Sequence, residues 1–209
     1  YGKADKISNE QNYNFDEEVI RIEKTLAIVA KNQSFHLVGH SCGGAIALKL
    51  AVEKPKRILS LSLFEPVAFH LLEQGSNARE IADGFAHKVD IDDNYQAAEI
   101  FTNFWNKDGF FRALPQKMQN LMARDMPTVS LNFKGLTSET YSLKDLSAIA
   151  CRSLIMTGDF SPELSHLLSN TIAVNLPNVE HASFPTGHMG PVSHNHLIHP
   201  FIADFILKV

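Results

Sequence analysis

The chain has 209 residues, of which 44% are hydrophobic, and its formal net charge is −4. At roughly 100–200 residues per domain, this length allows one domain, or one domain with a small addition, with enough apolar residues for a core. A mildly acidic chain without a cluster of lysines and arginines is poorly suited to bind nucleic acid. No apolar run approaches the roughly 20 residues that span a bilayer, so we expect no membrane segment.

The two cysteines, Cys42 and Cys151, lie far apart in the sequence and belong to no CxxC pair. They predict no disulfide framework, and a reducing compartment such as the cytoplasm fits them best. The first residues, Tyr1 to Lys6, do not resemble a signal peptide and include no initiator methionine.

The first third of the chain alternates between helical and extended patterns. Asn14 followed by Glu17 is typical of a helix N-terminus, and apolar residues at spacings of three and four continue this helix to about Lys31. The next predicted elements are a strand at 35–38 that ends at Gly39, a helix at 43–54 and a buried strand at 58–64. Such alternation indicates an α/β fold with a mostly parallel sheet flanked by helices.

The segment 67–149 has helical spacing, with candidate helices at 78–88, 95–106 and 114–124 and no convincing strand. An insert of this size between two strands of a sheet is most simply a helical lid. Alternation returns with a strand at 153–157, a helix at 162–170, a strand at 179–184 and a terminal helix opened by Pro200. We therefore expect an α/β core at 1–66 and 150–209, with a helical cap at 67–149.

The segment Gly39-His40-Ser41-Cys42-Gly43 matches the pattern G-x-S-x-G. A β-prone run leads into it and an alanine-rich helix follows, which is the strand–turn–helix setting that the motif requires. A serine on such a turn has a strained backbone, so we expect Gly39, Gly43 and Gly44 to be needed for their lack of bulk. The turn would present Ser41 Oγ as a nucleophile, and the N–H of Cys42 at the helix N-terminus would stabilise an oxyanion.

A serine hydroxyl needs a base within hydrogen-bond reach, and His188 is the best placed of the ten histidines. It lies between Gly187 and Gly190 in a loop directly after the last predicted strand. His36 and His40 are interpreted as a strand residue and a turn residue. Three further histidines have no acidic or cysteine partner nearby, which favours a solvated surface over a metal site; they are His194, His196 and His199.

Together these segments resemble the α/β-hydrolase family. Residues 35–66, from Phe-His-Leu-Val-Gly-His-Ser-Cys-Gly-Gly to Leu-Phe-Glu-Pro, are similar to its nucleophile strand, elbow, helix and next strand. Residues 153–191 resemble its last two strands and histidine loop, and residues 1–6 are similar to the loop before the preceding helix. The resemblance implies strands before residue 1, including a loop that donates the second oxyanion N–H, so we expect the chain to be part of a longer protein.

The resemblance leaves two candidates for the acid that orients the histidine. Ser161 occupies the usual family position, three residues after the glycine that ends the penultimate strand, and Asp159 lies two residues earlier. The family's alternative position, at the end of the strand after the elbow helix, is Glu65. Either carboxylate could accept a hydrogen bond from His188 Nδ1–H. Glu65 is the favoured candidate, because a glutamate that closes an apolar strand needs a reason to be there.

The resemblance implies a carboxylesterase-like serine hydrolase that cleaves an ester or related acyl bond through an acyl-enzyme, without a cofactor or metal. The expected lining of a pocket for a small apolar substrate is Phe69, Phe104, Trp105 and Met189. One alternative is a carbon–carbon bond hydrolase of diketone-like acids that uses the same residues, and another is a non-catalytic binding protein with the same fold. We expect a small-molecule partner, and the sequence also allows a homo-oligomer.

Overall fold

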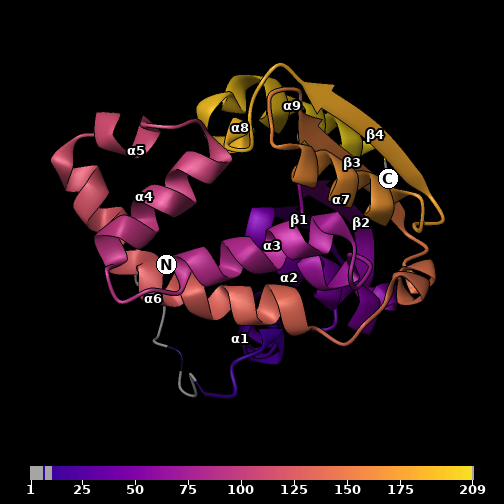
Figure 1. The fold of residues 1–209 in the computed structure, drawn as a ribbon. Coiled ribbons are helices and arrows are strands. Elements are labelled where there is room, and N and C mark those ends of the chain that lie inside the picture. Colours follow the sequence, from indigo (N-terminus) through magenta and orange to yellow (C-terminus); the bar gives the residue numbers. More distant parts are fainter. Residues whose placement is uncertain (1–6, 8–10, 209) are drawn as a thin grey trace.

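Four parallel strands form the central sheet of the molecule (Figure 1). The computed structural model describes residue 7 and residues 11–208, so the segment 1–6 compared above lies outside the described residues. In sheet order the strands are β1 (Phe35–His40), β2 (Ile58–Phe64), β3 (Arg152–Gly158) and β4 (Val179–Phe184). All three pairings are parallel, so the carboxyl ends of the strands meet at one edge of the sheet. The predicted α/β fold is confirmed.

Helices cover both faces of this sheet. The helices that accompany the strands are α1 (Phe15–Val29), α2 (Ser41–Glu53), α7 (Glu163–Ala173), α8 (Gly190–Ser193) and α9 (Asn195–Leu207). Neighbouring residues of β2 point to opposite faces: Leu63 packs in the larger core with Leu48 of α2, and Phe64 packs in a second cluster with Phe205 of α9. Burial on both faces explains why β2 reads as a continuous apolar run rather than an alternating one.

The first helix begins where the sequence predicts it. Asn14 Oδ1 accepts a hydrogen bond from the N–H of Asp16 at 2.9 Å and so caps the helix. Glu17 Oε1 accepts a hydrogen bond from Arg21 one turn further on, also at 2.9 Å. The helix ends at Val29, slightly before the predicted end near Lys31.

Four helices are inserted between β2 and β3: α3 (Asn77–Val89), α4 (Asn94–Trp105), α5 (Phe110–Ala113) and α6 (Gln116–Ser138). In Figure 1, α4 and α5 lie well away from β3 and β4. The first two match the predicted helices, but the prediction of 114–124 is too short. The helix continues through Pro127, a residue whose missing N–H usually interrupts a helix. Among the described residues, no helix combines the length and the apolar character that crossing a membrane requires.

The prediction that Pro200 opens the terminal helix is wrong. The helix α9 begins at Asn195 and contains Pro200 in its interior. The N–H groups of Leu197 and Ile198 already donate to the carbonyl oxygen of His194, and the side chain of Ile198 is fully buried. Burial of this side chain favours helical structure in the residues before Pro200, so the first turn of the helix lies ahead of the proline.

Candidate active site

Ser41 lies at the tight turn between β1 and α2, with a φ of +54° in the left-handed region that residues other than glycine seldom adopt. A Cβ on Gly39 would lie 2.7 Å from the Cα of Gly44 and 2.8 Å from the carbonyl oxygen of Gly43. A Cβ on Gly44 would lie 3.0 Å from the Cα of Pro66. The turn therefore requires glycine at 39, and it leaves very little room at 44.

Gly43 does not have the steric role that the sequence predicts for it. A Cβ at this position would meet no atom within 4 Å apart from its chain neighbours and the backbone of its own helix. The residue contributes its carbonyl oxygen to the surface that Gly39 packs against, and any residue type has a carbonyl oxygen. Of the three glycines, only Gly39 and Gly44 are closely packed.

A chain of hydrogen bonds joins Ser41, His188 and Glu65. The distance from His188 Nε2 to Ser41 Oγ is 2.9 Å, and the distance from His188 Nδ1 to Glu65 Oε2 is 2.6 Å. His188 is 1% exposed and Glu65 is fully buried, so water does not compete for the bond between them. Glu65 follows β2 directly with a φ of +43°, and His188 lies in the loop after β4. The carboxyl edge of the sheet thus brings together residues that are far apart in the sequence.

Asp159, the other candidate acid, does not join this chain of hydrogen bonds. Its side chain is exposed, and its backbone N–H donates to the carbonyl oxygen of Phe184 at 2.8 Å. Both ring nitrogens of His188 are already hydrogen-bonded, to Ser41 and to Glu65, which leaves no nitrogen for a second carboxylate. Ser161 has a buried hydroxyl without a hydrogen bond of ordinary geometry, but it lies near enough to Glu65 to lower the pKa of that carboxyl.

The environment of Glu65 decides which nitrogen of His188 carries a proton. Burial by itself would raise the pKa of the Glu65 carboxyl, but hydrogen bonds from His188 and from the N–H of Gly158, at 2.7 Å, outweigh it and hold the pKa below its usual range. The ionised carboxylate can only accept, so Nδ1 of His188 carries the proton. Nε2 is then free to accept the proton of Ser41, as a general base must.

Cys42 offers its backbone N–H rather than its thiol. Because α2 begins at Ser41, the N–H of Cys42 belongs to the first turn, whose amides have no partner within the helix. Desolvation by burial, together with the negative charge of Glu18, raises the pKa of the thiol to about 12. The thiol stays protonated near neutral pH and is a poor nucleophile.

His40 connects the turn to the histidine loop. Its Nε2 lies 2.8 Å from the carbonyl oxygen of His188, and its ring contacts the rings of His188 and Phe64, at 5.0 and 5.7 Å between centroids. Burial, and after it repulsion from His188, lower the pKa of His40 to about 4. The imidazole is therefore neutral near pH 7, and Nε2–H donates to the His188 carbonyl. The sequence indicated a turn residue but not this contact across the site.

A small cavity of about 50 Å³, here called the inner cavity, lies beside Ser41 and Cys42. The rest of its wall comes from the inserted segment and is almost entirely apolar: Val67, Phe69, Phe101, Trp105, Val129, Asn132, Phe133 and Leu136. Trp105 also stacks on His188, with ring centroids 3.9 Å apart and an interplanar angle of 21°. The inserted segment therefore forms most of the wall of this cavity, and Trp105 from it covers one face of the His188 ring.

The structure divides the four residues expected to line a substrate pocket. Phe69 and Trp105 line the inner cavity. Phe104 does not: it stacks on Phe85 at 3.9 Å and lines a different cavity between α3 and α4. Met189 is 38% exposed and lies at the start of α8. Neither Phe104 nor Met189 therefore lines the inner cavity, and for Phe104 the reason is that helical spacing identifies apolar side chains but not the face that meets the site.

Sequence reasoning missed the part of the wall that α6 contributes. Val129, Phe133 and Leu136 all lie beyond Pro127, outside the predicted helix 114–124. The available signal was the spacing of Met126, Val129, Phe133 and Leu136, which places four apolar residues on one helix face.

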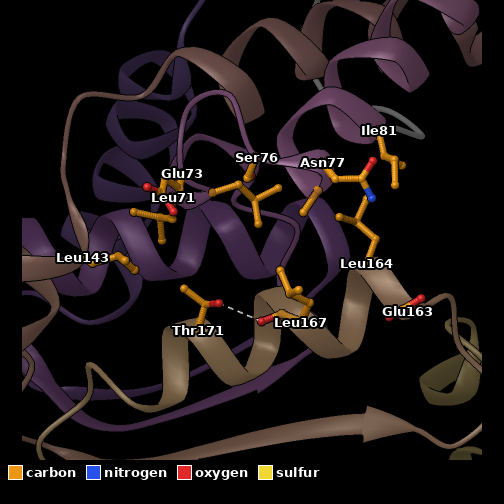
Figure 2. A pocket seen from close by; sticks show the side chains of 12 residues that line it. Leu71, Glu73, Ser76, Asn77, Ile81, Leu143, Glu163, Leu164, Leu167 and Thr171 are labelled. Atoms are coloured by element: carbon orange, nitrogen blue, oxygen red, sulfur yellow. Dashed lines mark hydrogen bonds between the residues drawn. The ribbon is translucent and has the colours of Figure 1, made fainter.

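A cavity of about 800 Å³ lies elsewhere, between the start of α3 and helix α7 (Figure 2). Its wall includes Leu71, Ile81, Leu164 and Leu167, which are spread around the hollow in Figure 2, but neither Ser41 nor His188. Although this cavity is large, it does not adjoin the Ser41 hydroxyl. Within the described part of the chain, no three or more His, Cys, Asp or Glu side chains are grouped so that they could hold a metal ion.

Comparison with known proteins agrees with the α/β fold. The α/β-hydrolase fold family model matches residues 1–174. A segment of 66 residues is 41% identical to a probable lysophospholipase of Arabidopsis thaliana, covering 32% of this chain and 14% of that protein, so the chain matches only a small part of it. An esterase from Exiguobacterium antarcticum superposes with a TM-score of 0.75 at 17% identity, covering 99% of this chain and 78% of the esterase.

A second solved structure gives the same result. A meta-cleavage product hydrolase from Pseudomonas fluorescens superposes with a TM-score of 0.74 at 13% identity, covering 100% of this chain and 76% of the other. At such low identities these two structures establish a common fold only, whereas the family match extends over most of the chain. On the strength of that match and of the parallel sheet with its Ser41 turn, the chain belongs to the α/β-hydrolase fold family.

Proposed function

We propose that the protein is a serine hydrolase that cleaves an ester or related acyl bond of a small apolar substrate. The observation that carries the proposal is the hydrogen-bonded chain from Ser41 through His188 to a buried, ionised Glu65. A serine hydroxyl beside an imidazole that is itself oriented by a carboxylate is the arrangement of an activated nucleophile. The esterase and lysophospholipase among the similar proteins support an ester substrate.

In the proposed reaction, Ser41 Oγ attacks the acyl carbonyl carbon while its proton moves to Nε2 of His188. The carbonyl oxygen becomes an oxyanion that accepts a hydrogen bond from the N–H of Cys42. His188 then returns the proton to the leaving alkoxide, and the acyl group remains on Ser41. Water, deprotonated by the same imidazole, attacks the acyl-enzyme and releases the acid, which restores the Ser41 hydroxyl. Glu65 stabilises the imidazolium in both halves of the reaction.

The same proposal makes the inserted segment 67–149 a cap over the nucleophile. In its support, this segment supplies every side chain of the inner cavity except Ser41 and Cys42. Trp105 from this segment covers one face of His188, and an apolar cover strengthens hydrogen bonds at the site by excluding water.

The lining of the inner cavity favours esters over the alternative substrates. A carbon–carbon bond hydrolase of diketone-like acids would have to hold a carboxylate. None of the described residues that line the inner cavity is a lysine or an arginine, and Asn132 is the only amide among them. Burial of a carboxylate against such a wall without a cationic partner is costly. A non-catalytic binding protein would not need the hydrogen bonds that orient His188 between Ser41 and Glu65.

Hydrolysis of p-nitrophenyl acetate tests the proposal. We expect the protein to release p-nitrophenolate and Ser41→Ala to lose about 10⁴-fold or more of kcat, because no other group near the carbonyl can form the acyl-enzyme. A diketone-like ring-cleavage acid is the matched comparison substrate. Faster cleavage of that acid than of the ester would replace the proposal with the carbon–carbon alternative, and absence of both reactions would overturn enzymatic function at this site.

A further inference from the structure

Phe133 lines two separate cavities. One is the inner cavity beside Ser41, of about 50 Å³. The other is a more open cavity of about 170 Å³ between α3 and α6, here called the outer cavity. Its lining is Asp83, Ala86, His87, Asp90, Ser130, Phe133, Lys134 and Thr137. Among the described residues, Phe133 is the only one that lines both.

The ring of Phe133 is held in place by other aromatic side chains. It stacks on Phe69 with 6.2 Å between centroids and an interplanar angle of 11°, and it meets Phe85 edge to face at 5.2 Å and Phe101 at 6.4 Å. The residue is only 5% exposed. A ring packed on several sides does not turn away to admit a longer ligand without disturbing its neighbours.

The volume of the inner cavity limits what can be attached to Ser41. An apolar cavity of about 150 Å³ holds a benzene molecule of six carbons. On that scale a cavity of about 50 Å³ accommodates about two carbons. The outer cavity would add space for about seven more, but its lining is largely polar and charged, unlike the apolar wall beside Ser41.

We propose that Phe133 is the floor of the acyl site and restricts the protein to short acyl chains, of about two carbons. This inference rests on the proposed function and adds the size of its substrate. A longer acyl chain would have to displace the Phe133 ring. Removal of the ring would join the inner cavity to the outer cavity and admit chains of about nine carbons.

A series of p-nitrophenyl esters from acetyl to octanoyl tests this proposal with the wild-type protein, Phe133→Leu and Phe133→Ala. We expect wild-type kcat/KM to fall by about tenfold or more between acetyl and hexanoyl esters, and the Phe133 variants to reduce or reverse that ratio by a similar factor. Thermal unfolding of each variant shows which proteins are folded, and Phe133→Leu preserves more of the packing than Phe133→Ala.

Two further variants distinguish a floor from a general packing residue. Phe111→Leu removes a ring that is equally buried in the inserted helices but lines neither cavity, so the ratio of hexanoyl to acetyl turnover should stay at the wild-type value. Ala86→Phe, combined with Phe133→Leu, refills the outer cavity that Ala86 lines, so the short-chain preference should return.

The possible results distinguish a failure of the proposed role of Phe133 from a failure of the proposed function. If the wild-type protein hydrolyses octanoyl and acetyl esters equally well, or if Phe133→Leu lowers all chain lengths by one factor, Phe133 is not the floor, although Ser41 can still be the nucleophile. If Ser41→Ala keeps full activity, or if no ester is hydrolysed, the proposed function fails and the inference fails with it.

Discussion

At the scale of single residues, the hydrogen bond between Glu65 and His188 predicts different effects for substitutions at Glu65 and at Asp159. Glu65→Gln keeps the shape of the side chain but presents an amide that does not hold His188 in the required tautomer. We expect kcat to fall by about 10³- to 10⁴-fold. Asp159→Asn, at an exposed side chain, should leave kcat unchanged. The opposite ranking of the two variants in steady-state ester hydrolysis would assign the acid to Asp159.

His40 makes a second residue-scale prediction, because its Nε2–H donates to the carbonyl oxygen of His188. His40→Phe keeps a buried ring but removes the donor, which should loosen the histidine loop and lower kcat by about tenfold with little change in KM. His40→Gln restores an N–H donor on a side chain of similar reach and should recover most of kcat. Equal losses in both variants would show that only the packing of the ring matters.

The same residues show what sequence can and cannot supply. Ser41 and His188 could be named from local patterns, a G-x-S-x-G between strand and helix and a glycine-flanked histidine after the last strand. The choice between Glu65 and Asp159 could not be made, because it depends on which strand end points its carboxylate at His188 Nδ1. The left-handed backbone of Glu65 and the hydrogen bond from the N–H of Gly158 decide that direction, and neither can be predicted from the sequence.

At the scale of elements, the turn between β1 and α2 predicts different outcomes for two glycines. Gly39→Ala would place a Cβ 2.7 Å from the backbone of Gly44, so we expect a loss of about 2–3 kcal/mol in the free energy of unfolding. Gly43→Ala, in the first turn of α2 with open space around it, should be neutral or stabilise the protein by up to about 1 kcal/mol. Urea unfolding measures both, and equal losses would contradict the packing of the turn.

The elements of the core were easier to predict than those of the inserted segment. Each strand is a short apolar run bounded by turn residues, because side chains on both faces of the sheet are covered by helices. In α6, helical spacing continues through Pro127, where a lost backbone hydrogen bond must be offset by packing of Val129, Phe133 and Leu136 against the rest of the molecule. The apolar spacing beyond Pro127 was a local signal of the helix, but the proline argued against it, and the predicted inner wall was incomplete for that reason.

At the scale of the whole molecule, two partly buried histidines predict that stability falls with acidity. Burial is the main cause that lowers the pKa of His40 and of His70 to about 4. Between about pH 6.5 and pH 4, the unfolded chain binds a proton at each position and the folded protein does not, so folding stability falls as the pH falls through this window. The upper limit is on the order of 3 kcal/mol for each histidine.

Urea unfolding at about pH 7 and about pH 5, with His70→Phe as the comparison, measures this effect. The variant has no titrating ring at position 70, so it should lose less stability on acidification than the wild-type protein. Glu65 acts in the same direction at lower pH, because its contribution is present above the usual carboxyl pKa and is lost as the pH falls through its depressed folded value. The same pH dependence in the variant and the wild-type protein would show that His70 titrates normally in the fold.

If β1, β2 and the loop after β4 together activate the Ser41 hydroxyl, Ser41 should react with a fluorophosphonate. Covalent labelling followed by peptide mass spectrometry measures this, since the reagent reacts with activated serines and only slowly with ordinary hydroxyls. We predict a single adduct on Ser41 that is absent in Ser41→Ala and greatly slowed in Glu65→Gln. An adduct on another serine, or no adduct in the folded protein, would show that Ser41 is not an activated nucleophile.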